Sequence, residues 1–280
     1  MLNDITFGQY YPANSLMHRL DPRVKILLTV GLIVLCFVAR IAPSLLLVAL
    51  LTGILLLCTR VPVKMYLKTL KPIIPVILIT SVINAVYVSS GTPLFQVWRI
   101  TVTTGGVLTA VYMSVRICLL IMSSSMLTYT TTPTDLTDAI ERLLTPLKWI
   151  RLDVHSLAMM MTIALRFIPT LIEETEKIMS AQKARGADVE SGGLLSRIRA
   201  LIPILIPLLI SSFRRASELA DAMECRCYHG GDDRTRMKQL HLRFWDVALL
   251  TLAAVCLGVI ILSNHYLSGV LYSLLFGGVL

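Results

Sequence analysis

Two arginines stand between small residues, and each follows a stretch that predicts a long helix. Arg185 lies in the sequence AQKARGAD, and Arg226 lies in the sequence ECRCYHG. Their neighbours are Ala184 and Gly186 in the first case, and Cys225 and Cys227 in the second. A guanidinium presents a planar fork of donors that suits a carboxylate or a group of carbonyls. Because small neighbours let another backbone come close, we expect each arginine to bind a protein partner.

The two arginine motifs form an internal repeat. A shift of 41 residues places residues 180–187 over 221–228, with Ala181 on Ala222 and Arg185 on Arg226. Two equivalent motifs predict a partner with two equivalent binding sites, such as a dimer or a pseudo-dimer. The alternative is that both arginines are ordinary basic residues that a helix dipole favours near a C-terminus.

Other residues could carry chemistry instead. Asp135 and Asp138 recur on one stretch and, with His155, could form the site of a membrane-embedded enzyme. Cys225, Cys227 and His229 have ligand types that suit zinc, but a fourth ligand is not evident. We favour a solvated helix face for the acids. The sequence contains no Gly-x-x-x-x-Gly-Lys-Ser/Thr phosphate loop for binding a nucleotide.

The composition is that of a membrane protein. Of the 280 residues, 55% are hydrophobic and 15% are charged, and the mean hydropathy is +0.74. A soluble chain of this length could not bury so much apolar surface. The net charge of +9 lies beside apolar runs, where it sets topology, so we expect no nucleic-acid partner. Four of the six cysteines lie in apolar runs, and no disulfide framework is implied.

Five apolar runs are candidates for membrane spans. They cover residues 26–39, 41–59, part of 72–98, 105–131 and 247–262. Asp21 and Pro22 are a good N-cap and first residue for the first helix, and Lys25 could snorkel to its end. Residues 1–23 are polar and predict no cleavable signal peptide. A turn at residues 263–266 should lead into a tail too short to cross the membrane, with a possible re-entrant piece.

Loop charges predict the orientation of the spans. The connection at residues 60–71 carries four basic residues and no acid, whereas the connections after the first and third spans carry one basic residue each. Basic loops stay cytoplasmic. We therefore expect a multi-pass protein with a cytoplasmic N-terminus. Arg116 lies inside the fourth span, and we expect it to bond carbonyls or polar side chains such as that of Asn84.

Residues 133–243 have a different character, with 16 of the 26 Lys/Arg and 14 of the 17 Asp/Glu residues. A short amphipathic helix should run to about Lys148. Two long helices should follow, at about 154–184 and 194–227, the second kinked by two prolines and closed by Gly230 and Gly231. Their apolar stretches are short, so we expect both helices to lie against the inner face of the membrane. One such stretch cannot face the cytosol unaided and is a candidate partner surface: Leu201, Ile204, Leu205, Leu208 and Leu209.

The chain thus divides into three parts and one fold class. Residues 1–132 hold the N-terminal segment and four spans, residues 133–243 a cytoplasmic region with two long helices that end near Arg185 and Arg226, and residues 244–280 the last span and an apolar tail. The fold class is an all-α integral membrane protein.

The sequence resembles a family of transport proteins. The opening FGQYYPANSLMHRLDPRVKILL, together with KARGAD and ECRCYHG, is similar to the transmembrane T component of energy-coupling factor (ECF) transporters of the shared, group II type. The resemblance covers nearly the whole chain. It implies a non-catalytic subunit in the plasma membrane of a prokaryote, where it couples ATP hydrolysis to the uptake of vitamins or metal ions.

The resemblance also implies partners. Two ABC ATPase subunits, which bind the ATP, would receive Arg185 and Arg226 with their small neighbours, and a substrate-binding S component would contact other surfaces. Our candidate for that contact is the apolar stretch at 201–209, with packing on the protein's own spans as the alternative. No cofactor of the chain itself is implied. The cysteines in the second motif depart from the alanine and glycine usual in the family, so docking should survive and could become redox-sensitive. The other classes left open are the enzyme above and a self-contained transporter, which should place acids within its spans.

Overall fold

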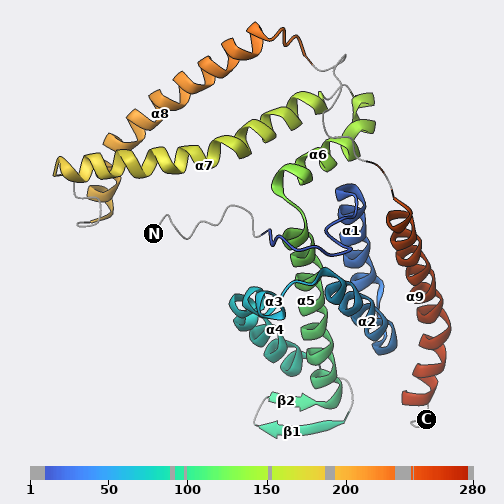
Figure 1. Ribbon diagram of the computed structural model, residues 1–280. Helices are drawn as coiled ribbons and strands as arrows, with labels where there is room; N and C mark the ends of the chain where they lie inside the picture. Colours follow the sequence, from blue (N-terminus) through green and yellow to red (C-terminus); the bar gives the residue numbers. More distant parts are fainter. Residues whose placement is uncertain are drawn as a thin grey trace. The chain divides into compact units, whose positions relative to one another are not determined.

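A computed structural model describes residues 10–88, 92–97, 100–150, 153–186, 193–230, 241 and 243–276 (Figure 1). The chain forms two compact units. The bundle unit contains the described parts of residues 9–132 and 240–280, and the long-helix unit contains those of residues 133–239. Each unit is described by itself.

The bundle unit consists of helices packed around a central one. In chain order its elements are α1 (Pro22–Val38), α2 (Ala42–Thr59), α3 (Val63–Leu70), the 3₁₀ turn η1 (Lys71–Ile73), α4 (Ile74–Tyr87), β1 (Pro93–Val97), β2 (Ile100–Thr103), α5 (Thr104–Thr130) and α9 (Phe244–Phe276). Helix α5 contacts α1, α2, α3 and α4, while α1 also packs against α9 (Figure 1). The buried core joins apolar side chains of α1, α2, α5 and α9, among them Leu32, Val48, Met126 and Ile260.

Helix α1 begins where the sequence predicts. The Asp21 carboxylate accepts a hydrogen bond from the Arg23 backbone N–H at 3.0 Å, and Pro22 is the first helical residue. Lys25 extends toward the start of α1, but it differs from the prediction because its side chain is buried and does not reach the surface. Its ammonium donates to the carbonyl oxygens of Thr130 at 2.8 Å and His18 at 3.4 Å. Lys25 therefore joins the start of α1 to the carbonyl end of α5.

A buried carboxylate ties together the N-termini of α1 and α9. Asp246 is fully buried, and its Oδ1 accepts from the backbone N–H of Asp21 at 2.9 Å. Its Oδ2 accepts from the backbone N–H of Arg243 at 2.6 Å, which is the bond that an acid at the third helical position makes to the N-cap. One side chain thus satisfies donors at the ends of two neighbouring helices, and the sequence analysis did not single it out.

Helix α9 is continuous from Phe244 to Phe276, so the predicted turn at residues 263–266 is wrong. The polar residues that suggested a turn bond to neighbouring helices instead. Asn264 donates through Nδ2 to the Val38 carbonyl at 2.6 Å and accepts from the Ser44 hydroxyl at 3.1 Å. These bonds satisfy both ends of the Asn264 amide at the junction of α1 and α2, which leaves the α9 backbone helical.

A short hairpin separates α4 from α5. The third predicted span ends at Tyr87, and strands β1 and β2 then pair antiparallel, with Val97 opposite Ile100. Apart from this hairpin the regular structure of the described residues is helical, and the predicted all-α membrane fold is confirmed.

Six helical segments among the described residues are long and apolar enough to cross a membrane. Four of them lie in the bundle unit: Ala42–Thr59, Val63–Tyr87, Thr104–Thr130 and Phe244–Asn264. Helix α1, with 17 residues, extends about 25 Å and is slightly short of a bilayer core of about 30 Å. The other two segments, Val154–Ala184 and Arg199–Cys225, lie in the long-helix unit and are apolar along part of their length.

The long-helix unit contains α6 (Pro133–Leu144), the 3₁₀ segment η2 (Thr145–Ile150), α7 (Val154–Ala184) and α8 (Leu194–Cys225). Helices α7 and α8 are antiparallel and cross each other (Figure 1). Two contacts define the crossing: Gln182 donates to the Pro203 carbonyl at 3.3 Å, and Arg215 lies 3.6 Å from the Glu174 carboxylate. Helix α8 is continuous through both of its prolines.

Replacing Asp246 tests the link between α1 and α9. Asp246→Ala leaves the N–H groups of Asp21 and Arg243 without their acceptor, which should cost about 2–4 kcal/mol of stability. Asp246→Asn keeps one acceptor oxygen and should cost less. The measurement is the fraction of monodisperse protein after heating the full chain in detergent. Glu218→Ala, at an exposed acid on α8, should match the unchanged protein, and equal thermal stability of all four proteins would contradict the assignment.

Candidate functional site: two arginine tips

Each arginine with its two small neighbours forms the end of a long helix, which we call an arginine tip, and the first tip lies at the end of α7. The helix ends at Ala184, and Arg185 is its C-cap, with φ −85° and ψ 6°. Gly186 follows in the left-handed region with φ +85°, and its N–H donates to the Lys183 carbonyl at 3.0 Å. Glycine is the usual residue at this position because it has no Cβ to clash. The side chain of Arg185 is exposed.

The second arginine tip closes α8 with the same backbone. The helix ends at Cys225, and Arg226 is its C-cap, with φ −94° and ψ 19°. Cys227 then adopts φ +56°, and its N–H donates to the Glu224 carbonyl at 2.8 Å. The Tyr228 N–H reaches back to the Met223 carbonyl at 3.1 Å, which completes a Schellman motif. Arg226 is exposed, as Arg185 is.

The residue that closes α8 differs from the prediction. Gly230 has φ +107° but lies three positions beyond Cys227, which already makes the left-handed turn. Gly231 lies outside the described residues. A non-glycine residue in the left-handed region costs on the order of 1 kcal/mol. Cys227 occupies the position that Gly186 occupies at the end of α7. The two helix ends therefore share the left-handed backbone conformation even where their sequences differ.

The two tips lie far apart. Gln182, three residues before the first tip, contacts Pro203, and α8 continues from there to the second tip at Arg226. That stretch of helix rises about 35 Å. The two guanidiniums therefore stand tens of ångströms apart, and a single small groove could not hold both.

The predicted partner surface on α8 is largely exposed. Leu201, Leu205 and Leu209 are exposed at 42%, 57% and 59%, and Leu208 is partly buried. Ile204 is only 3% exposed and packs inside the protein, so it does not form part of an accessible surface. Exposed apolar residues that the prediction omitted are Ile202, Ile206, Ile210 and Phe213. The sequence did not identify them because residues 201–210 are all apolar or proline, so no polar residue marks which face of the helix is exposed.

His155, one of the residues proposed for an enzyme, pairs with a glutamate of α6. His155 Nδ1 lies 3.0 Å from the carboxylate of Glu141, a pairing that joins α6 to α7, and neither Asp135 nor Asp138 is its partner in that bond. Within the described residues, no group of three or more His, Cys, Asp or Glu side chains could hold a metal ion, and these residues include Cys225, Cys227 and His229.

Helix α7 is capped by Asp153 at its N-terminus, the end of the helix away from Arg185. The Asp153 carboxylate accepts from both the backbone N–H and the hydroxyl of Ser156. The hydroxyl bond is the main reason that the pKa of Asp153 is lowered, and the backbone bond adds to it. The carboxylate therefore remains charged at the positive end of the helix dipole.

Arg116 joins helices within the bundle unit. It donates to the Ala39 carbonyl at 2.6 Å, and its guanidinium lies 4.8 Å from the ring centre of Tyr112. The Tyr112 hydroxyl donates to the same carbonyl. A carbonyl partner is as predicted, but Asn84 donates to Thr80 within its own helix instead.

Comparison with known proteins defines the class. The cobalt transport protein family, CbiQ, matches residues 13–238. Two curated relatives are named energy-coupling factor transporter transmembrane protein EcfT. The one from Ruminiclostridium cellulolyticum is 49% identical over 95% of this chain and 99% of its own length. The one from Bacillus subtilis is 43% identical over 91% of this chain and 98% of its own length.

The apolar helices and these matches together define a multi-pass membrane transport protein. The chain belongs to the CbiQ/EcfT family, as its sequence motifs predicted.

Two cysteine-to-glycine substitutions test the backbone of the second tip. Cys227→Gly relieves the left-handed residue and should slow hydrogen exchange in the last turn of α8, through a local gain of about 0.5–1 kcal/mol. Cys225→Gly removes a residue from the end of the helix proper and should speed exchange there by a similar free energy. Changes of the same sign in both variants would show that Cys227 does not adopt the left-handed conformation.

Proposed function

We propose that this chain is the transmembrane coupling subunit of an ECF-type importer. It links ATP hydrolysis by a pair of ATPase subunits to the reorientation of a substrate-binding S component, and the cargo is a vitamin or another micronutrient. Arg185 and Arg226 each bind one ATPase subunit. The observation that carries the proposal is the pair of exposed arginines at equivalent C-caps of two long crossing helices.

The cap geometry supports docking for a physical reason. In both tips the chain turns away immediately after the arginine, so the guanidinium stands at the end of the helix with only small side chains beside it. A groove on the partner can then close around the arginine and meet the backbone. A separation of tens of ångströms suits two ATPase subunits, one for each tip.

The crossing of α7 and α8 supports transmission of movement. The helices have 31 and 32 residues and are joined by the Gln182 and Glu174 contacts to α8. When the ATPase subunits approach each other, a displacement at the tips moves both helices about their crossing. The exposed apolar residues Leu201, Leu205 and Leu209, which lie close to the crossing, would then carry the movement to the S component.

The charge pattern supports the orientation. Lys64, Lys68 and Lys71 are exposed and follow the end of α2, at the same end of the bundle unit as the start of α1. Basic residues mark the cytoplasmic side. The proposal therefore has the N-terminus in the cytoplasm of a prokaryotic cell, on the side where ATP is hydrolysed.

Truncation of either arginine tests the proposal. An arginine that pairs with a partly desolvated acidic groove contributes about 2–5 kcal/mol by truncation. Arg185→Ala, Arg226→Ala and Arg226→Glu should each lower the affinity for the ATPase subunits at least tenfold. The measurements are ATPase co-purification and substrate uptake by membrane vesicles, with the yield of the chain itself determined alongside.

Arg214→Ala is the matched control, because Arg214 is an exposed arginine on α8 away from either tip. It should leave complex formation and uptake unchanged. If the three tip variants also formed the complex in normal yield and supported normal uptake, the proposed function of the tips would be refuted.

A further inference from the structure

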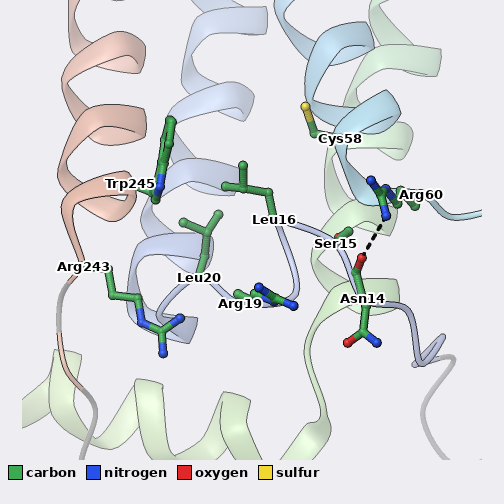
Figure 2. Close-up of a pocket in the computed structure, with 9 residues that line it drawn as sticks. All are labelled: Asn14, Ser15, Leu16, Arg19, Leu20, Cys58, Arg60, Arg243 and Trp245. Carbon is green, nitrogen blue, oxygen red and sulfur yellow. Dashed lines mark hydrogen bonds between the residues drawn. The ribbon is translucent and has the colours of Figure 1, made fainter.

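A cavity of about 700 Å³ opens in the bundle unit at the end where α1 and α9 begin and α2 ends (Figure 2). It is formed by the turn before α1, the last residues of α2 and the first residues of α9. Its principal lining residues are Leu16, Arg19, Cys58, Arg60, Arg243 and Trp245.

The lining of the cavity combines three arginines with an apolar wall. In Figure 2 the side chains of Arg19 and Arg243 lie in its lower part, that of Arg60 lies at its right side next to Asn14, and those of Leu16 and Trp245 lie above Arg19 and Arg243. Each of the three arginines comes from a different segment of the chain. The wall is open to the surroundings, since Leu16 is 44% exposed and Trp245 is 57% exposed.

The positive charge of the cavity is not neutralised by its own lining. No acidic residue is among the lining residues, and within the described part of the chain the one side-chain hydrogen bond of the three arginines joins Arg60 to the Asn14 carbonyl at 3.4 Å. The nearby carboxylates of Asp21 and Asp246 are buried and bond to backbone N–H groups. Three guanidiniums therefore remain available to an anion.

Arg60 occupies its position at a conformational cost. It caps α2 in the left-handed region, with φ +55°, where glycine or asparagine would be less strained. A strained residue that persists points to a role for its side chain. Here the strained backbone directs a guanidinium to the edge of the cavity.

The position of the cavity identifies the kind of anion. Helices α2 and α9 both contain candidate membrane spans, so the open apolar wall faces the region of acyl chains, and the arginines lie at the level of the headgroups. Tryptophan is enriched at this level of a membrane. Arginine forks match phosphate oxygens, and basic pockets between transmembrane helices bind anionic headgroups.

We propose that this cavity binds one anionic phospholipid. The phosphate of the headgroup contacts Arg19, Arg60 and Arg243, and an acyl chain follows Leu16 and Trp245 between α2 and α9. The occupied site would stabilise the helix ends that Asp246 joins.

Native mass spectrometry of the full chain in detergent tests this site, with phosphatidylglycerol as the probe. Zwitterionic phosphatidylethanolamine and soluble glycerol 3-phosphate serve as comparison ligands. The unchanged protein should retain one phosphatidylglycerol at least tenfold more tightly than phosphatidylethanolamine, and glycerol 3-phosphate should not displace it. A site for a free phosphate would instead bind glycerol 3-phosphate equally well, which would overturn the proposal.

The site variant is Arg19→Gln/Arg60→Gln/Arg243→Gln, and the matched control is Lys64→Gln/Lys68→Gln/Lys71→Gln. Both remove three positive charges at the same end of the bundle unit. The site variant should lose the tenfold preference and the control should keep it. Arg19→Gln alone, which changes a side chain outside any helix, should weaken retention severalfold if the triple variant fails to fold. Equal loss in site variant and control, or full retention by Arg19→Gln, would overturn the proposal.

Discussion

The left-handed turn that follows each arginine is the constraint on which the rest of this account depends. A helix leaves its last carbonyls without partners, and a left-handed residue just after the C-cap lets the chain satisfy them while turning sharply aside. At Gly186 the turn is conformationally easy, and at Cys227 it is held at some cost. In both places the result is an exposed arginine at the very end of a long helix, with a small residue before it and a small residue after it in the sequence.

The bundle unit is stabilised by polar side chains that form hydrogen bonds to backbone groups at helix ends. Asp246 binds N–H groups at the start of α1 and beside the start of α9, and Lys25 binds a carbonyl at the end of α5. Arg116 and Asn264 bind carbonyls where α1 ends. Unpaired backbone groups at these positions would be costly in an apolar environment. These four polar side chains therefore satisfy backbone groups at the places where helices begin and end.

Much of this arrangement could be predicted from the sequence. Composition and apolar runs predicted a helical membrane protein, and Asp21 with Pro22 marked the start of α1, because these signals are local. The tips could be found because small residues around an arginine are unusual, and the shift of 41 residues brought them together. The structure then showed a shared backbone conformation that the cysteine at 227 concealed, since cysteine is not a residue expected in the left-handed region.

The remainder depended on contacts between distant segments. Asn264 looked like a turn residue until its bonds to Val38 and Ser44 were known, and Asp246 looked like an ordinary acid at a helix start. The sequence alone could not distinguish the buried Ile204 from its exposed neighbours, because burial depends on tertiary contacts. The most direct measurement of the central claim is an electron cryomicroscopy map of the chain in complex with its ATPase subunits. Our account predicts that each guanidinium, at 185 and at 226, lies within about 3 Å of oxygen atoms of a different ATPase subunit. A map in which either arginine faces lipid or open water would contradict it.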